Sequence, residues 1–127
     1  MHRLAFFGTS AFAVPLLRAL RQDARFSGSV VVTQPDRPVG RKQTLTPPPV
    51  KEVAMEHGLP VLQPERLRAP ESVAALTEHT FDAAVVASYG QILPQTVLDL
   101  ASQRFINLHG SILPKYRGAS PIAEAIK

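Results

Sequence analysis

Residues 3–33 read RLAFFGTSAFAVPLLRALRQDARFSGSVVVT, and this stretch decides the fold class. Its apolar start at residues 3–8 ends at a glycine, which is typical of a buried strand. Apolar side chains then recur at helical spacing over residues 11–22, which predicts a helix. The β-branched run at residues 29–33 predicts a second strand. A strand, a helix and a strand in this order predict two parallel strands joined by a right-handed crossover.

The rest of the chain continues this alternation. We expect helices at residues 50–57, 70–78, 93–101 and 119–127, and strands at residues 60–62, 81–87 and 105–108. This order predicts an α/β fold with an open, doubly wound and mostly parallel sheet. No internal repeat or domain boundary interrupts it. The helical pattern still runs at Lys127, so we expect the sequence to be a fragment of a longer protein.

Residues 34–49 differ in character from their surroundings. They read QPDRPVGRKQTLTPPP and hold five of the twelve prolines. Proline lacks the backbone N–H and restricts the residue before it, so this stretch predicts a long loop without regular elements. Loops of this length in a compact domain are usually functional or disordered.

Composition limits the classes of protein to consider. The chain has 127 residues, enough for one domain with a buried core, and no cysteine, which excludes disulfides and thiolate metal sites and suits a cytoplasmic protein. It has no apolar run of the roughly 20 residues that span a bilayer and no signal-peptide pattern. Its four histidines lack zinc-ligand spacing, so we expect no metal. The net charge of +4 permits a polyanionic partner such as tRNA.

Ligands of such sheets bind at the carboxyl ends of the strands, where two glycine-containing turns are expected. The turn at residues 8–13 (GTSAFA) lacks the second and third glycines of a dinucleotide-binding turn. It is either a ligand-facing turn or a helix cap made by Thr9 or Ser10. In the turn at residues 88–94 (SYGQILP), Gly90 suits a positive φ, and the backbone could hold a flat polar ring. An ordinary connection from strand to helix is the alternative.

Asn107 and His109 lie at the end of the last expected strand. Alternate residues of a strand share a face, so these two side chains project together with Phe105, and residues 106 and 108 face the other way. An amide and a protonated imidazole are both hydrogen-bond donors and could stabilise an oxyanion during acyl transfer. His109 could also move a proton. The alternative is a pair of polar side chains that are merely hydrogen-bonded.

Four motifs together resemble one known family. They are FFGTSAFAVPLL at residues 6–17, VVTQPDRPVGRKQTLTPPPVK at 31–51, ASYGQILP at 87–94 and INLHGSILPKYRGASPI at 106–122. In this order and spacing they resemble the methionyl-tRNA formyltransferases, within the family of formyltransferases that use 10-formyltetrahydrofolate. The NxHxSxLP element is common to the wider family, whereas the proline-rich loop narrows the resemblance to the tRNA enzymes. The resemblance covers nearly the whole chain.

The resemblance implies a Rossmann-like formyltransferase fold and a reaction. The α-amine of methionine on initiator tRNA, in translation initiation, would attack the formyl carbon of 10-formyltetrahydrofolate, with no metal, in a monomeric cytoplasmic enzyme. Asn107 and His109 would hold the carbonyl oxygen as it becomes anionic. The folate would be bound by Tyr89, Gly90, Gln91, Ile92 and Leu93 and by Ser111, Ile112, Leu113 and Pro114. The tRNA would be bound by Arg37, Arg41 and Lys42.

The chain departs from the family pattern in places. The family shows FGTP and NLHAS where this chain has FGTS and NLHGS at residues 7–10 and 107–111. Residues 1–127 would be the N-terminal part of the catalytic domain. The aspartate that completes the family's triad and its C-terminal tRNA-binding barrel would lie beyond Lys127. The isolated chain should therefore have little activity.

Three other functions stay open from the sequence. One is a folate-dependent formyltransferase with a different amine acceptor, such as a nucleotide sugar or glycinamide ribonucleotide. Another is a module that binds folate or tRNA without chemistry. The third is a dinucleotide-binding Rossmann domain, against which the missing glycines argue.

Overall fold

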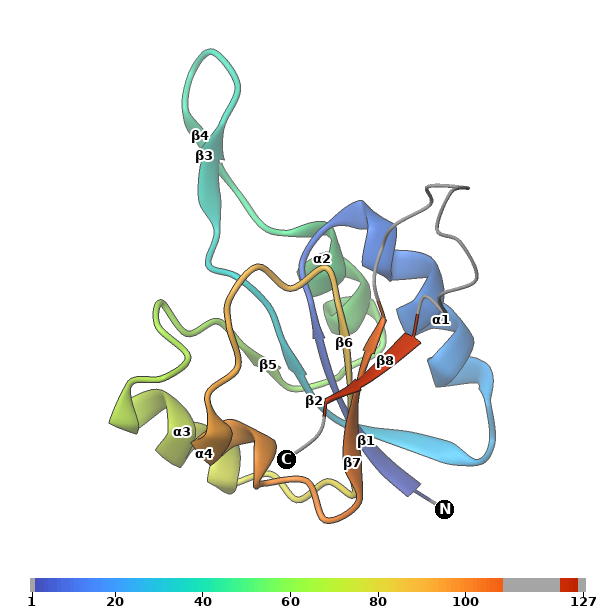
Figure 1. Ribbon diagram of the computed structural model, residues 1–127. Helices are drawn as coiled ribbons and strands as arrows, with labels where there is room; N and C mark the ends of the chain where they lie inside the picture. The colour runs from blue at the N-terminus through green and yellow to red at the C-terminus, as the bar shows by residue number, and fades with distance from the viewer. Residues whose placement is uncertain (1, 109–121, 126–127) are drawn as a thin grey trace, which may run out of the picture.

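The computed structural model describes residues 2–108 and 122–125, the latter as backbone only (Figure 1). Its helices are η1 (Ala11–Ala13), α1 (Val14–Gln22), α2 (Pro49–Glu56), α3 (Pro70–Thr77) and α4 (Gln95–Leu98). Its strands are β1 (His2–Gly8), β2 (Phe26–Val32), β3 (Arg37–Val39), β4 (Thr44–Thr46), β5 (Val61–Leu62), β6 (Ala83–Ala87), β7 (Arg104–Leu108) and β8 (Ile122–Ala125).

A six-stranded sheet of order β5-β2-β1-β6-β7-β8 organises the chain. All neighbouring pairs are parallel except β7 and β8, which are antiparallel. From β1 the chain builds outward to β2 and β5, and then returns to β6 and β7 on the other side of β1. The strand order therefore reverses between β1 and β6, which is where ligands of open α/β sheets bind. The predicted doubly wound fold class is confirmed.

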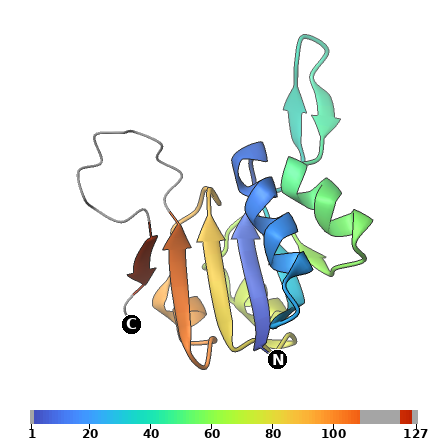
Figure 2. The same ribbon diagram turned by 90° about the vertical axis from the view of Figure 1, so that its right-hand side faces the viewer.

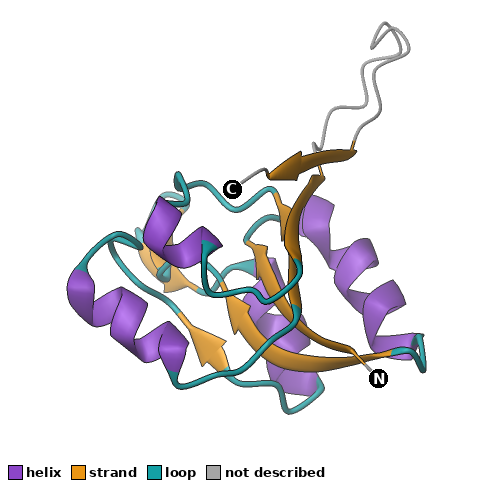
Figure 3. Cartoon of the chain, turned by 60° about the horizontal axis from the view of Figure 1, so that its bottom comes forward, coloured by secondary structure: helices purple, strands orange, loops and turns teal. Residues whose placement is uncertain are grey.

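Helices cover both faces of the sheet, so its apolar side chains form two cores (Figures 2 and 3). Alternation along β1 sends Phe6 toward the core with α1 and α2, and Phe7 toward the core with α3 and α4. Phe7 is fully buried, with its ring centroid 5.6 Å from those of both Tyr89 and Phe105. These aromatic contacts join the strands β1 and β7 and the turn after β6.

None of the helices in residues 2–108 has the length and apolar character that crossing a membrane requires.

The first expected helix is confirmed over residues 14–22 as α1, but residues 11–13 form the 3₁₀ turn η1. The Ser10 hydroxyl caps that turn by accepting a hydrogen bond from the Phe12 N–H at 3.3 Å. Of the two alternatives for this turn, the cap made by Ser10 is the one observed.

The prediction that residues 34–49 lack regular elements was wrong, because β3 and β4 form an antiparallel hairpin there. Gly40 and Gln43 adopt positive φ angles of 82° and 54°, and the Gln43 N–H donates to the Gly40 carbonyl at 3.1 Å to close the tip. Pro38 is tolerated opposite Leu45 because each strand of a two-stranded ribbon is an edge strand. Every residue from 37 to 46 is exposed, and the hairpin projects beyond the main sheet (Figure 1).

Two predicted helices differ from the structure. The helix expected at residues 93–101 is only α4, because Pro94 occupies the N-cap position and disfavours helical geometry at Leu93. Within the helix expected at 119–127, residues 122–125 instead form β8, which pairs with the free edge of β7. Such an edge presents unpaired backbone groups that another strand satisfies. Residues 119–121 and 126–127 lie outside the described part.

Replacing Phe105 with Ala should lower the free energy of unfolding by about 3–5 kcal/mol, since a buried aromatic ring leaves a cavity that the core fills only in part. The ring is fully buried between Phe7 and Phe81. Urea unfolding of the full-length protein, followed by circular dichroism, measures the loss. Phe12, which is 50% exposed, is the control, and F12A should cost less than about 1 kcal/mol. Equal losses in the two variants would contradict the assigned core.

Candidate functional site

A pocket of about 410 Å³ opens at the carboxyl ends of β6 and β7, beside the point where the strand order reverses. It is lined by Val86, Ser88, Tyr89, Gly90, Gln91, Ile92, Leu93, Leu98 and Asn107. The set therefore includes all five residues predicted to bind folate in the turn after β6, together with Asn107. Its lining combines apolar side chains of β6 and α4 with the residues of that turn and Asn107.

Asn107 reaches the pocket because of its place on β7. Phe105, two residues earlier, is fully buried in the core with α3 and α4, whereas Leu108 packs against the other core. The predicted alternation along this strand is thus confirmed for residues 105–108. Asn107 pairs with Val86 of the neighbouring strand and is half-buried, so its amide lies at the rim of the pocket.

Several predicted residues lie outside the described part of the chain. They are His109 and the four residues expected to bind folate, namely Ser111, Ile112, Leu113 and Pro114. Their roles remain predictions.

The turn after β6 has an unusual backbone. Ser88 has a φ of 55° and Gly90 a φ of 105°, so Gly90 meets the expectation of a positive φ. A Cβ on Gly90 would lie only 2.7 Å from Nε2 of Gln34. The backbone angle therefore favours glycine at this position, and any other side chain would also displace the end of the Gln34 side chain.

The turn after β1 holds the turn after β6. The Thr9 N–H donates to the Ser88 carbonyl at 3.0 Å, and Thr9 Oγ1 donates to the Tyr89 carbonyl at 2.7 Å. The Ser10 and Ser88 hydroxyls are 2.7 Å apart. Thr9 and Ser10 are thus engaged with protein groups. The sequence alone left this turn open as a ligand site, but in the structure it holds the pocket turn in place through these hydrogen bonds.

The ring of Tyr89 belongs to the core with α3 and α4 although Tyr89 also lines the pocket. Its side chain is 3% exposed, and its ring makes an edge contact with Phe7. Burial raises the pKa of its hydroxyl, which has no hydrogen-bond partner among the described residues. Ile92, by contrast, lines the pocket and is 90% exposed.

The Gln91 side chain is also occupied by the protein. Its Oε1 accepts from the Leu67 N–H at 2.7 Å, and its Nε2 donates to the Pro64 carbonyl at 3.1 Å and to Oε1 of Gln34 at 2.8 Å. The Gln91 side chain therefore has protein partners at both ends of its amide, and its predicted contact with folate stays a prediction. Its amide instead fixes the turn against the loop after β5.

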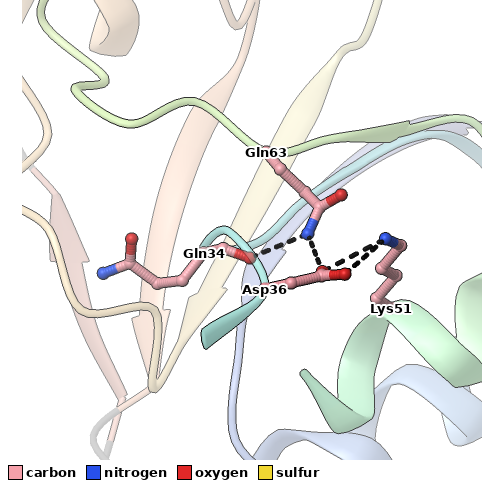
Figure 4. A network of polar contacts seen from close by, with 4 residues as sticks. All are labelled: Gln34, Asp36, Lys51 and Gln63. Atoms are coloured by element: carbon pink, nitrogen blue, oxygen red, sulfur yellow. Dashed lines mark hydrogen bonds and ion pairs between the residues drawn. The ribbon is translucent and has the colours of Figure 1, made fainter. Parts of the chain in front are cut away.

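A second polar network secures the start of the hairpin (Figure 4). Gln63 Nε2 donates to the Gln34 carbonyl at 3.1 Å and to Asp36 Oδ1 at 2.7 Å. Lys51 Nζ lies 3.1 Å from the same carboxylate oxygen. The Gln63 amide, and next the Lys51 ammonium, lower the pKa of Asp36 below its ordinary value. Asp36 is therefore ionised at neutral pH, and this anchor holds the start of the hairpin to Lys51 of α2 and to Gln63 after β5.

Sequence reasoning missed this anchor, because no local pattern relates Asp36, Lys51 and Gln63. The one available signal was topological. Gln34 and Gln63 each follow a strand, and the two strands, β2 and β5, are neighbours in the sheet. Polar residues that follow neighbouring parallel strands meet at one edge.

The basic residues predicted to bind tRNA lie on the hairpin beyond this anchor. Arg37 begins β3, whereas Arg41 and Lys42 lie at the tip, and all three are exposed. Val39 and Leu45 on the same hairpin are 54% and 65% exposed. The hairpin thus presents positive charge and apolar surface together. Within residues 2–108, no three acidic or histidine side chains gather where they could hold a metal ion.

Curated relatives match nearly the whole chain. A protein of Lysinibacillus sphaericus is 50% identical over 126 residues, which are 99% of this chain and 40% of that protein. One of Geobacter metallireducens is 53% identical over 119 residues, which are 94% of this chain and 38% of that protein. Both bear the name methionyl-tRNA formyltransferase. The chain spans about 40% of the length of these relatives.

Solved structures agree with the fold. The phosphoribosylglycinamide formyltransferase of Anaplasma phagocytophilum matches with a TM-score of 0.67 at 17% identity, over 99% of this chain and 65% of that one. The enzyme of the same name from Bacillus halodurans matches with a TM-score of 0.62 at 24% identity, over 94% of this chain and 61% of that one. The model of the formyl transferase family matches residues 2–127. The chain therefore belongs to the formyl transferase family.

Proposed function

We propose that the full-length protein transfers the formyl group of 10-formyltetrahydrofolate to the α-amine of methionine on initiator tRNA, in the cytoplasm. One observation carries the proposal. A pocket with Asn107 at its rim and a basic hairpin lie at the same edge of the sheet. A formyl donor and a polyanionic acceptor need such a pair of sites close together. The name shared by relatives that are about 50% identical supports this choice.

In the proposed reaction the amine nitrogen attacks the formyl carbon, and a new C–N bond forms. The carbonyl oxygen becomes an oxyanion, to which the Asn107 amide donates a hydrogen bond. The bond from the formyl carbon to N10 of the folate then breaks, N10 gains a proton and the amine loses one. His109 would hold the same oxyanion and move this proton, since its ordinary pKa lies near 6.5. An aspartate beyond Lys127 would favour protonated His109.

The pocket offers a place for the folate ring. The Gln91 and Thr9 side chains hold the turn from the protein side, and Thr9 already bonds the Ser88 and Tyr89 carbonyls. The polar edge of the ring would pair with the remaining backbone groups of residues 88–93. Ile92 and Leu93 supply apolar contact, and Ser111, Ile112, Leu113 and Pro114 would complete the site. This arrangement uses no metal.

The hairpin supplies the acceptor site. Arg37, Arg41 and Lys42 would contact phosphates of the tRNA acceptor end, and such contacts are largely independent of nucleotide sequence. A small acceptor such as glycinamide ribonucleotide does not need a basic projection of this kind. The hairpin is therefore the feature that favours tRNA over a small amine.

Replacing Asn107 with Ala should lower kcat for formylation of methionyl-tRNA by about 10²–10³-fold, the usual loss for one oxyanion donor. The H109A variant should lose at least as much. Tetrahydrofolate affinity should change little, because both groups act on the transferred carbon. Steady-state kinetics and a tetrahydrofolate titration of the full-length protein measure the two effects. Gln95 is exposed, and among the described residues its side chain bonds Asp99 alone, so Q95A should behave as wild type. An unchanged kcat in N107A would refute the oxyanion role.

Replacing both Arg41 and Lys42 with Ala should raise KM for methionyl-tRNA and leave KM for the folate unchanged. Each lost phosphate contact should reduce the slope of log affinity against log salt by about 0.7–0.9. Binding of methionyl-tRNA measured over a series of salt concentrations gives this slope. The control removes two exposed cations of α1, Arg18 and Arg21, and should leave the slope near that of wild type. Equal effects of the two double variants would point to nonspecific charge attraction.

A further inference from the structure

The basic hairpin and the pocket turn are joined by two short hydrogen-bond paths. In the first, Nε2 of Gln91 in the turn donates to Oε1 of Gln34 at 2.8 Å, and Gln34 lies three positions before the hairpin begins at Arg37. In the second, the Gln34 N–H donates to Thr9 Oγ1 at 3.3 Å, and this hydroxyl donates to the Tyr89 carbonyl at 2.7 Å. Gln34 is the residue that both paths share.

The direction of the link between the two glutamines is determined by their surroundings. The Leu67 N–H can only donate and the Pro64 carbonyl can only accept, and they contact opposite ends of the Gln91 amide. Nε2 of Gln91 therefore faces Gln34, which must present its oxygen. The missing side chain of Gly90 leaves room for the Gln34 amide at this point.

Both ends of the hairpin are also held by hydrogen bonds near the carboxyl ends of the parallel strands. On one side, Asp36 is held by Gln63 and Lys51. On the other side, β4 leads through prolines into α2, and the N–H of Val50 donates to the Thr9 carbonyl at 3.3 Å. A change in the angle of the hairpin therefore strains the same groups that hold the pocket turn.

We propose that Gln34 is a positioning residue that couples the pocket to the hairpin, so that folate and methionyl-tRNA bind cooperatively. This inference rests on the proposed function. Folate that pairs with the backbone of residues 88–93 fixes Gln91, and Gln91 fixes Gln34 and the base of the hairpin. The base of the hairpin is docked when the bond between Gln34 and Gln91 is made and released when it is broken. Binding of either ligand favours the docked form, and by linkage each raises the affinity of the other by the same factor.

The test measures this factor in the full-length protein. Tetrahydrofolate, which carries no formyl group, is titrated by calorimetry with and without saturating methionyl-tRNA. The ratio of the two dissociation constants should be at least about fivefold for wild type, the lower end of usual coupling factors. Gln34→Met keeps the length of the side chain but removes the acceptor, so the ratio should fall to about one.

Gln34→Glu is the rescue variant, because a carboxylate oxygen still accepts from Gln91, and its ratio should stay within about twofold of wild type. The double variant Gln34→Glu with Gln91→Glu places two acceptors opposite each other and should again abolish coupling. Gln43→Met is the matched control, since in the part of the chain that the structure describes the Gln43 side chain bonds just the Gly40 carbonyl of the same hairpin. That variant should keep the wild-type ratio even if it alters the affinity for tRNA itself.

The outcomes separate this inference from the function on which it rests. Formyl transfer to methionyl-tRNA by wild type, with a ratio of one, would overturn the coupling and leave the proposed function intact. A wild-type ratio in Gln34→Met would overturn it too. Absence of formyl transfer to methionyl-tRNA would overturn the proposed function itself. If Gln34→Met fails to fold, the contrast between Gln34→Glu and the double variant decides.

Discussion

The hydrogen bonds of Thr9 hold together the segments that follow β2 and β6 and the start of α2, next to the pocket and the hairpin. Its hydroxyl donates to the turn after β6 and accepts from the N–H of Gln34, two residues after β2, while its carbonyl accepts from the first turn of α2. Thr9 follows the strand β1 directly, so its side chain can reach the segments that follow both neighbouring strands, β2 and β6. The pocket and the base of the hairpin take their relative places from this residue. The two cores on either side of β1 in turn hold Thr9 in place.

Much of this arrangement could be predicted from the sequence, because it follows from local pattern. The apolar run before Gly8 and the alternation along residues 105–108 predicted the central strand and the face of Asn107 correctly. Gly90 was recognised by the backbone angle that a tight turn needs. The roles of His109 and of residues 111–114 remain predictions of the resemblance.

What the sequence could not give depends on groups far apart in the chain. The proline density of residues 34–49 indicated an irregular loop, but only Pro38 lies within the strands, at an edge where no N–H is needed. The carboxylate of Asp36 meets Lys51 and Gln63 only after the sheet has formed. Residues 122–125 follow the same logic, since their helical pattern is overridden by a strand edge that needs a partner.

The fastening of the hairpin at both stems has a consequence for how such a protein can diverge. A two-stranded ribbon is only marginally stable by itself, and here its position is determined at Asp36 and at the start of α2 rather than at its tip. The tip at residues 40–43 contacts nothing that the pocket needs, and lengthening such a loop adds little entropic cost. Insertions and deletions there can alter the surface that the hairpin presents to the proposed tRNA acceptor, while the pocket at its base keeps its geometry.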